Sequence, residues 1–252
     1  MRKITFFTTV DGVQDAYPVI HAKDYRPNWI AGARDSYLKR KAKAEKENER
    51  FTHLYRCPGI FDIMSKGFIV PMMWDVIIET NGDDESFGWS VPSGELSLMH
   101  NNGNIVDGHM AHLIAQPLPK RQGYLKSLVK FNSPWHVVAP PDVKFMIIAI
   151  PYPDPEDAVF EQVPGILDPG LSTELNPQGY WKVLNGKHMI RAGTPMMQII
   201  PLTDEEFELE VKCAGEKEIA WAKKRNYFFN LAFAFKRTLM KAQYVKHFFG
   251  KD

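Results

Sequence analysis

The sequence has few cysteines, no long apolar run and almost no net charge. Its two cysteines, Cys57 and Cys213, lie far apart, which fits a reducing compartment and not a disulfide framework or a zinc site. No run of 18 apolar residues occurs, so no transmembrane helix is expected, and the polar N-terminal run does not fit a signal peptide. The net charge of +1 provides no overall basic field that would attract nucleic acid or an anionic membrane.

The common catalytic and nucleotide-binding motifs are also missing. The sequence contains no Walker motif, no glycine-rich dinucleotide loop and no nucleophile elbow. Hydrophobic residues make up 44% of the 252 residues and charged residues 24%, which is typical of a globular protein with a sizeable core. Function therefore has to be inferred from weaker patterns.

What the sequence does contain is a series of short β-type runs between turn signals. Lys3–Val10 is rich in β-branched and aromatic residues, and Asn81-Gly82 is typical of a hairpin turn. Further apolar runs occur at Lys144–Ile150 and Met196–Ile200. Their short spacing predicts an antiparallel β domain over residues 57–205, of the jelly-roll or β-clip type, within a mainly β (α+β) fold.

Different compositions flank this predicted β domain. Residues 1–56 combine the first strand with the charged stretch Arg34–Arg50, whose mixed signs predict a solvated, partly helical arm. Residues 206–252 are predicted to form a long C-terminal helix. We therefore expect three parts, with boundaries near residues 56 and 205.

The C-terminal region lacks helix breakers over a long stretch. Thr203 and Glu206 match a capping box, and no Pro or Gly follows from about Glu216 until Gly250. This pattern predicts one helix of roughly thirty residues. Because two of its sides are apolar, we expect it to contact its own β domain and a neighbouring copy of the chain, so that the protein forms a homo-oligomer.

The stretch GILDPGLSTEL, residues 165–175, carries the most specific polar pattern. A Pro-Pro corner, an apolar strand, an Asp-Pro-Gly corner and a late Gly-Thr-Pro-x-x-Gln-Ile-Ile strand follow one another between residues 139 and 202. This order resembles the dUTPase and dCTP deaminase superfamily. The resemblance implies a pyrimidine nucleotide enzyme that uses Mg²⁺, with Asp168, Glu174 and Gln198 as candidate site residues.

The same stretch also departs from that superfamily. Leu171 stands where dUTPases have an aromatic residue that stacks on the sugar, and their Arg-Ser-Gly phosphate motif and Gly-rich C-terminal flap are missing. A nucleotide hydrolase needs donors for its triphosphate as well as an acid or base. The alternative interpretation is that Asp168 caps its own backbone in a turn between strands.

A second resemblance covers most of residues 17–202. The segments YPVIHAKDYRPNW, CPGIFDIMSKGFIVPMMWDVIIET, FNSPWHVVAPPDVKFMI, VPGILDP and AGTPMMQIIPL occur in that order. They resemble an uncharacterised family of proteins carried by tailed bacteriophages, cyanophages above all. The resemblance implies a phage-encoded protein made in the cytoplasm of a bacterial host, and it brings no activity with it.

A third pattern concerns metal binding. The segment MHNNGNIVDGHMAHL contains Asp107, His109 and His112, and two histidines with a carboxylate are the ligand set of non-haem iron oxygenases. The usual order of that site places the first histidine before the carboxylate, whereas Asp107 precedes His109. A metal-dependent oxygenase is therefore a second alternative.

These patterns together favour a non-enzymatic function. Each candidate active site lacks part of its chemistry, and the polar motifs resemble turns. We expect a phage structural or accessory protein, with virion association as one possibility, that acts through contacts with itself and with other phage proteins. No cofactor, membrane or specific nucleic acid is expected.

Overall fold

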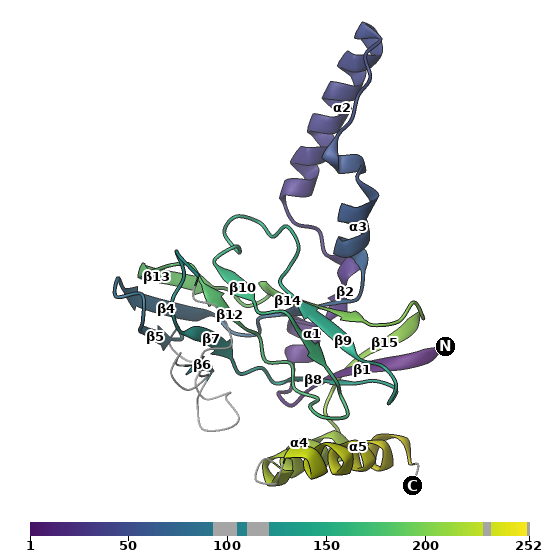
Figure 1. The fold of residues 1–252 in the computed structure, drawn as a ribbon, viewed down its shortest axis with the longest axis vertical. Coiled ribbons are helices and arrows are strands. Elements are labelled where there is room, and N and C mark those ends of the chain that lie inside the picture. The colour runs from purple at the N-terminus through teal and green to yellow at the C-terminus, as the bar shows by residue number, and fades with distance from the viewer. Residues whose placement is uncertain (93–104, 110–120, 229–232, 251–252) are drawn as a thin grey trace.

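The computed structural model describes residues 1–92, 105–109, 121–228 and 233–250, and it confirms a mainly β fold with helices toward both ends (Figure 1). The helices are α1 (Val13–Ala16), η1 (Ala22–Asp24), α2 (Trp29–Glu47), η2 (Leu54–Arg56), α3 (Pro58–Ser65), α4 (Glu216–Phe228) and α5 (Phe233–Phe249). The strands are β1 (Arg2–Thr8), β2 (Ile20–His21), β3 (Phe68–Pro71), β4 (Val76–Asn81), β5 (Phe87–Ser90), β6 (Val106–His109), β7 (Leu128–Phe131), β8 (Trp135–Val138), β9 (Phe145–Ile148), β10 (Phe160–Gln162), β11 (Gly165–Leu167), β12 (Gln178–Trp181), β13 (Asn185–Ile190), β14 (Pro195–Pro201) and β15 (Phe207–Cys213).

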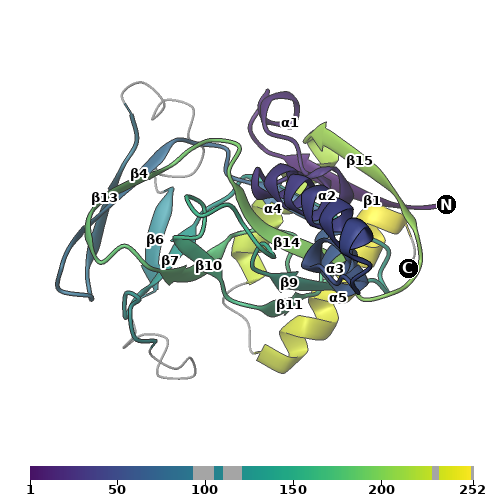
Figure 2. The same ribbon diagram turned by 90° about the horizontal axis from the view of Figure 1, so that it is seen from above.

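Within these residues the strands form four small sheets. Their orders are β15-β1-β8, β10-β12-β7-β6, β11-β9-β14-β3-β2 and β13-β4-β5. The neighbours are antiparallel except β1 and β15, which pair in parallel. The predicted Asn81-Gly82 turn ends β4 and leads into its antiparallel partner β5. Seen from above, β4 and β13 lie at one end of the body, and β1 and β15 at the other (Figure 2).

One core joins the sheets. Alternate residues of the central strands point inward, so Phe145 of β9 and Met197 and Ile199 of β14 are fully buried. Trp135 and Trp181 are buried in the same cluster. These two tryptophans therefore fill a core shared by strands from most of the described chain.

The three-part division of the sequence does not follow the packing. Strand β1, from the predicted N-terminal part, lies between β8 and β15. Strand β15, from the predicted helical part, continues this sheet, so both ends of the chain complete the β body. The capping-box prediction is wrong for the same region. Thr203 Oγ1 accepts a hydrogen bond from the Glu205 backbone N–H at 3.3 Å in a turn, and a strand follows.

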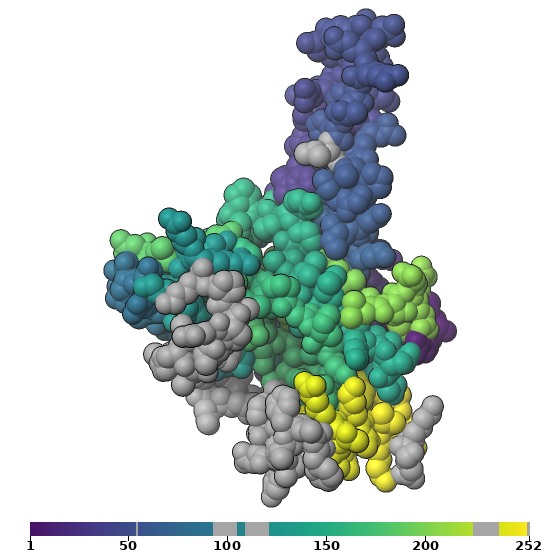
Figure 3. Space-filling view, in the orientation of Figure 1, coloured from purple at the N-terminus to yellow at the C-terminus, as the bar shows by residue number. Residues whose placement is uncertain are grey.

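Residues 22–67, from η1 to α3, form an arm that stands out from the β body (Figure 1, Figure 3). Helix α2 runs outward for 19 residues, or about 28 Å. Asn48 ends it in the left-handed conformation, with φ 53°, and the chain returns through η2 and α3. Pro58 is the first residue of α3, a position where its missing N–H is tolerated.

A glycine attaches the returning end of the arm to the body. Gly67 has φ +76°, and a Cβ on it would lie 2.1 Å from the Ile199 carbonyl oxygen. Its own carbonyl accepts a hydrogen bond from the Ala22 N–H at 2.9 Å. The two ends of the arm are therefore joined at its base, and only glycine allows so close an approach to β14.

The C-terminal region is helical, as predicted, but two helices replace the single helix expected. Trp221 of α4 lies 5.8 Å, between ring centroids, from Tyr244 of α5. One continuous helix would separate these residues by about 35 Å. Packing of Trp221 against the aromatic face of α5 favours two shorter helices that lie side by side. They cover the side of the body opposite the arm (Figure 1).

Candidate functional site

Asp168 follows β11 and is held by its surroundings. Its Oδ1 accepts a hydrogen bond from the Gly170 N–H at 3.1 Å, which is the backbone-capping turn proposed as the alternative. Its Oδ2 lies 2.7 Å from Lys241 Nζ of α5 and 4.0 Å from Lys144 Nζ. Only 12% of this side chain is exposed. Asp168 thus ties a turn of the body to the C-terminal helix.

Glu174 lies in the segment that follows this turn. Its backbone forms an isolated antiparallel bridge with His136, and its Oε2 accepts a hydrogen bond from Asn176 Nδ2 at 2.8 Å. Asn176 Oδ1 in turn accepts from the Ser133 N–H at 2.9 Å. The carboxylate therefore belongs to a network that joins this segment to the start of β8.

Gln198 lies on the opposite side of β14 from the core and is fully buried. Its Nε2 donates to the carbonyl oxygens of Ile63 at 2.7 Å and Lys66 at 2.6 Å. Both carbonyls are at the end of α3, where a helix leaves acceptors unsatisfied. Gln198 therefore caps α3 and anchors the arm. Asp168, Glu174 and Gln198 are each held by a different element: α5, the Asn176 segment and α3.

The residues of the predicted metal site are only partly described. Asp107 and His109 lie in β6, and Asp107 Oδ2 accepts a hydrogen bond from Asn132 Nδ2 at 2.7 Å. His112 lies outside the described residues. Across the residues that are described, no group of three or more His, Cys, Asp or Glu side chains is arranged to hold a metal ion. Nor does any helix in that part of the chain have the length and apolar character needed to cross a membrane.

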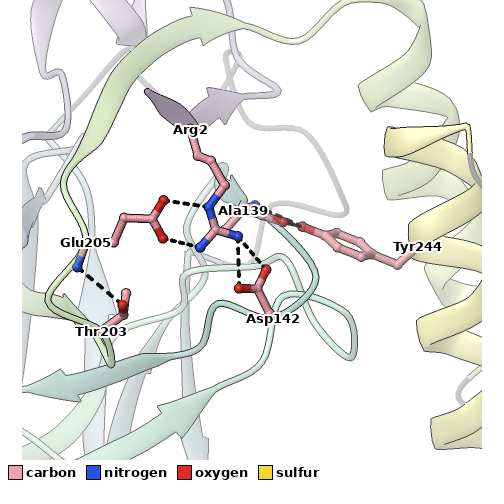
Figure 4. Close-up of polar contacts among 6 residues, drawn as sticks. All are labelled: Arg2, Ala139, Asp142, Thr203, Glu205 and Tyr244. Carbon is pink, nitrogen blue, oxygen red and sulfur yellow. Dashed lines mark hydrogen bonds and ion pairs between the residues drawn. The ribbon is translucent and has the colours of Figure 1, made fainter.

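An open groove of 590 Å³ runs between α5 and the body, with Pro141, Asp168 and Lys241 in its lining. Tyr244 closes one side of it and is almost fully buried. Its hydroxyl donates to the Ala139 carbonyl at 2.6 Å and accepts from the Ala139 N–H at 2.9 Å (Figure 4). Burial also raises the pKa of this phenol, so it stays neutral. The polar groups here attach α5 to the body.

Arg2 forms a second set of polar contacts near Ala139 and Tyr244 (Figure 4). Its Nη1 donates to both carboxylate oxygens of Asp142, at 2.7 and 2.9 Å, and its Nε donates to Glu205 Oε1 at 2.7 Å. Hydrogen bonds from Arg2 lower the pKa of Asp142 and of Glu205. The three side chains join the N-terminus, the turn before β9 and the turn before β15, so this charge cluster is a structural tie.

The polar groups above connect elements of the fold, whereas much of the surface of the arm contacts no other part of the described chain. A thin aromatic seam holds it together: Tyr37 of α2 stacks on Phe51 at 5.5 Å, and Tyr55 contacts Phe61 of α3 edge-on at 5.4 Å. Of α2, only Ala44 is buried, and Leu38 is 50% exposed. The outer part of the arm stands clear of the other described elements (Figure 1).

The base of the arm is firmly attached. Asp154, a buried carboxylate of the body, accepts hydrogen bonds from the N–H groups of Asn28 at 2.9 Å and Trp29 at 3.2 Å. Both groups belong to the start of α2, where a negative charge is favourable. Trp29 Nε1 also donates to the Tyr152 carbonyl at 2.7 Å. A rigidly based arm with an exposed shaft is suited to contact other molecules.

The sheet beside the arm also exposes apolar side chains. The register places Ile166 of β11 opposite Met146 of β9, and Ile148 of β9 opposite Gln198. Directly opposite residues point to one face, so these side chains share the face that α3 covers at Gln198. Ile166 is nevertheless 61% exposed, and Leu202, just after β14, is 51% exposed. We call Met146, Ile148, Ile166 and Leu202 the outer apolar patch.

Sequence reasoning missed this surface. The run Lys144–Ile150 was predicted only as a strand, because a single sequence does not show which face of a strand is covered. For the arm, a signal was visible in the sequence, because Leu38 is an apolar residue within a lysine-rich stretch. No family model, curated protein or solved structure matches this chain.

Proposed function

We propose that this chain is a phage-encoded structural or accessory protein without catalytic activity, which acts through protein–protein contacts. It is made in the cytoplasm of the bacterial host, and association with the virion is part of the proposal. The phage origin rests on the sequence resemblance. The mode of action rests on the geometry.

The arm is the observation that supports this function most directly. Residues 22–67 extend outward on a helix of 19 residues, and α2 buries only Ala44. An isolated helix with so little packing gains little stability from burial, since most helical stability in proteins comes from packing of an apolar face. Asp154 caps the base of the arm and holds it in place. The arm would bury more apolar surface, and so become more stable, when another protein covers α2.

The candidate catalytic groups support the same conclusion. Asp168 is engaged by Lys241 and by its own turn, and Gln198 by the end of α3. Both side chains hold separate elements of the fold together, which supports a structural role for them over a role in nucleotide chemistry.

Photo-crosslinking tests the proposal. A benzoylphenylalanine residue at Leu38 should crosslink to a defined set of proteins during infection, and mass spectrometry of purified particles should identify them. The same residue at Gln122, which is exposed on the body, provides the matched control and should give no such crosslinks. Absence of crosslinks from Leu38 under conditions where the protein accumulates would contradict the proposal.

A nucleotide screen tests the alternative directly. Thermal shift with deoxynucleotides and Mg²⁺ should show no stabilisation. Asp168→Asn should lower the melting temperature, because it removes the charge that pairs with Lys241. A nucleotide-dependent shift that disappears in Asp168→Asn while the stability stays unchanged would overturn the proposed function.

A further inference from the structure

The charges of this nearly neutral chain are segregated between the arm and the body. Residues 22–67 contain 11 Lys and Arg against 6 Asp and Glu, a net charge of +5. Residues 68–215, which form most of the β body, contain 9 Lys and Arg against 19 Asp and Glu, a net charge of −10. The arm and the body therefore attract each other, although the whole chain carries only +1.

The outer half of α2 presents cations that are not neutralised. Lys41 and Lys43 pair within the helix with Glu45 and Glu47, at 3.6 and 3.7 Å. Lys39 and Lys46 are exposed and form no ion pair with any described residue. They are seven residues apart, so they lie on one face of the helix, about 10 Å apart along its axis.

The body presents two carboxylates without an ion-pair partner in the described chain at the start of the edge strand β15, Glu206 just before it and Glu208 within it. Glu206 and Glu208 are exposed, and among the residues that the structure describes neither has an ion-pair partner. They are two residues apart, which is about 6.7 Å along an extended chain. Asp204 is fully exposed nearby, and Leu202 of the outer apolar patch lies two residues before it. The outer apolar patch is therefore bordered on this side by the carboxylates of Asp204, Glu206 and Glu208.

The arm cannot bring its own tip to this surface. Helix α2 points away from the body for about 28 Å, and its base is held by Asp154. The tip lies at the end of the molecule remote from β15 (Figure 1, Figure 3). Any contact of Lys39 and Lys46 with these carboxylates therefore has to form between two molecules.

We propose that two copies of this chain associate through their arms, with Lys39 and Lys46 of one copy on Glu206 and Glu208 of the other. Leu38 then approaches the outer apolar patch of the partner, and a two-fold axis satisfies both arms with the same contacts. This inference deepens the proposed function and rests on it. It also moves the self-association that the sequence placed on the C-terminal helix to the arm.

Sedimentation velocity of the full chain over a range of concentrations tests the inference. Lys39→Glu with Lys46→Glu, and separately Glu206→Lys with Glu208→Lys, should each weaken association at least about tenfold, because each juxtaposes like charges. Combining all four substitutions should restore association. Lys187 lies in β13 and Arg191 just after it, and β13 is at the far end of the body (Figure 2). Lys187→Glu with Arg191→Glu changes the net charge as much as the arm variant and should have no comparable effect.

Three results would overturn the inference. They are a wild-type chain that stays monomeric at every concentration, association that neither charge reversal weakens, and four substitutions that fail to restore it. A monomer that binds a labelled 30-base-pair duplex and loses binding in the arm variant would identify a polyanion as the partner instead. Crosslinks from Leu38 to other proteins by a monomer would refute self-association and leave the proposed function intact.

Discussion

Gln198→Met tests whether a candidate catalytic side chain is structural. Gln198 is fully buried, and its Nε2 donates to the Ile63 and Lys66 carbonyls at 2.7 and 2.6 Å. Methionine has a similar length and no donor, so both carbonyls lose their partner. Each lost hydrogen bond costs about 1 kcal/mol, so the free energy of unfolding should fall by about 2 kcal/mol. In a chain of this size the melting temperature should then fall by roughly 4–8 °C.

Urea denaturation followed by tryptophan fluorescence measures this change. Both proteins are compared at one concentration, because self-association would shift the apparent stability. Hydrogen exchange should also become faster in the last turn of α3, since Gln198 caps it. Gln122→Met, on the exposed surface, is the control and should stay within about 0.5 kcal/mol of wild type. A Gln198→Met chain with wild-type stability and unchanged exchange in α3 would refute the capping role.

Two further substitutions test the polar ties. Tyr244→Phe removes the hydroxyl that binds both main-chain groups of Ala139, and it should lower the free energy of unfolding by about 2–3 kcal/mol. Tyr152→Phe, at a 51% exposed side chain, is its control, and equal effects of the two would contradict the prediction. Arg2→Ala should destabilise the protein at neutral pH, because Arg2 lowers the pKa of Asp142 and of Glu205. Stability from lowered carboxyl pKa values is lost as the pH falls below the ordinary carboxyl pKa, so the gap to wild type should narrow below about pH 5 in urea titrations. A difference in stability between Arg2→Ala and wild type that does not change with pH would argue against ion pairing of Arg2 with Asp142 and Glu205.

Several elements were predictable because their causes are local. The β-branched run at Lys3–Val10 forms β1, and the run at Met196–Ile200 lies within β14. The charged stretch Arg34–Arg50 lies largely in α2, whose Lys–Glu pairs four residues apart stabilise it. Asn81-Gly82 ends β4 because Gly82 adopts φ 88° without strain.

The candidate site was much less predictable. Asp168 was recognised as a turn residue or a catalytic acid, and its sequence neighbours suit both roles. Its ion pair with Lys241 shows a structural contact that the sequence did not indicate, since those two residues are 73 positions apart. Gln198 matched a family pattern, whereas its contacts with the end of α3 depend on where the arm returns to the sheet.

By itself, then, the sequence determined the mainly β character, the charged helical arm and the helical C-terminus, because propensity and short-range pairing act within a few residues. Only the tertiary structure decided that β1 pairs with β15, that Trp221 folds α4 against α5, and that Leu38 and Ile166 remain exposed. Those outcomes depend on which distant surfaces bury one another, and a run of apolar residues has the same local pattern whether its face is covered or not.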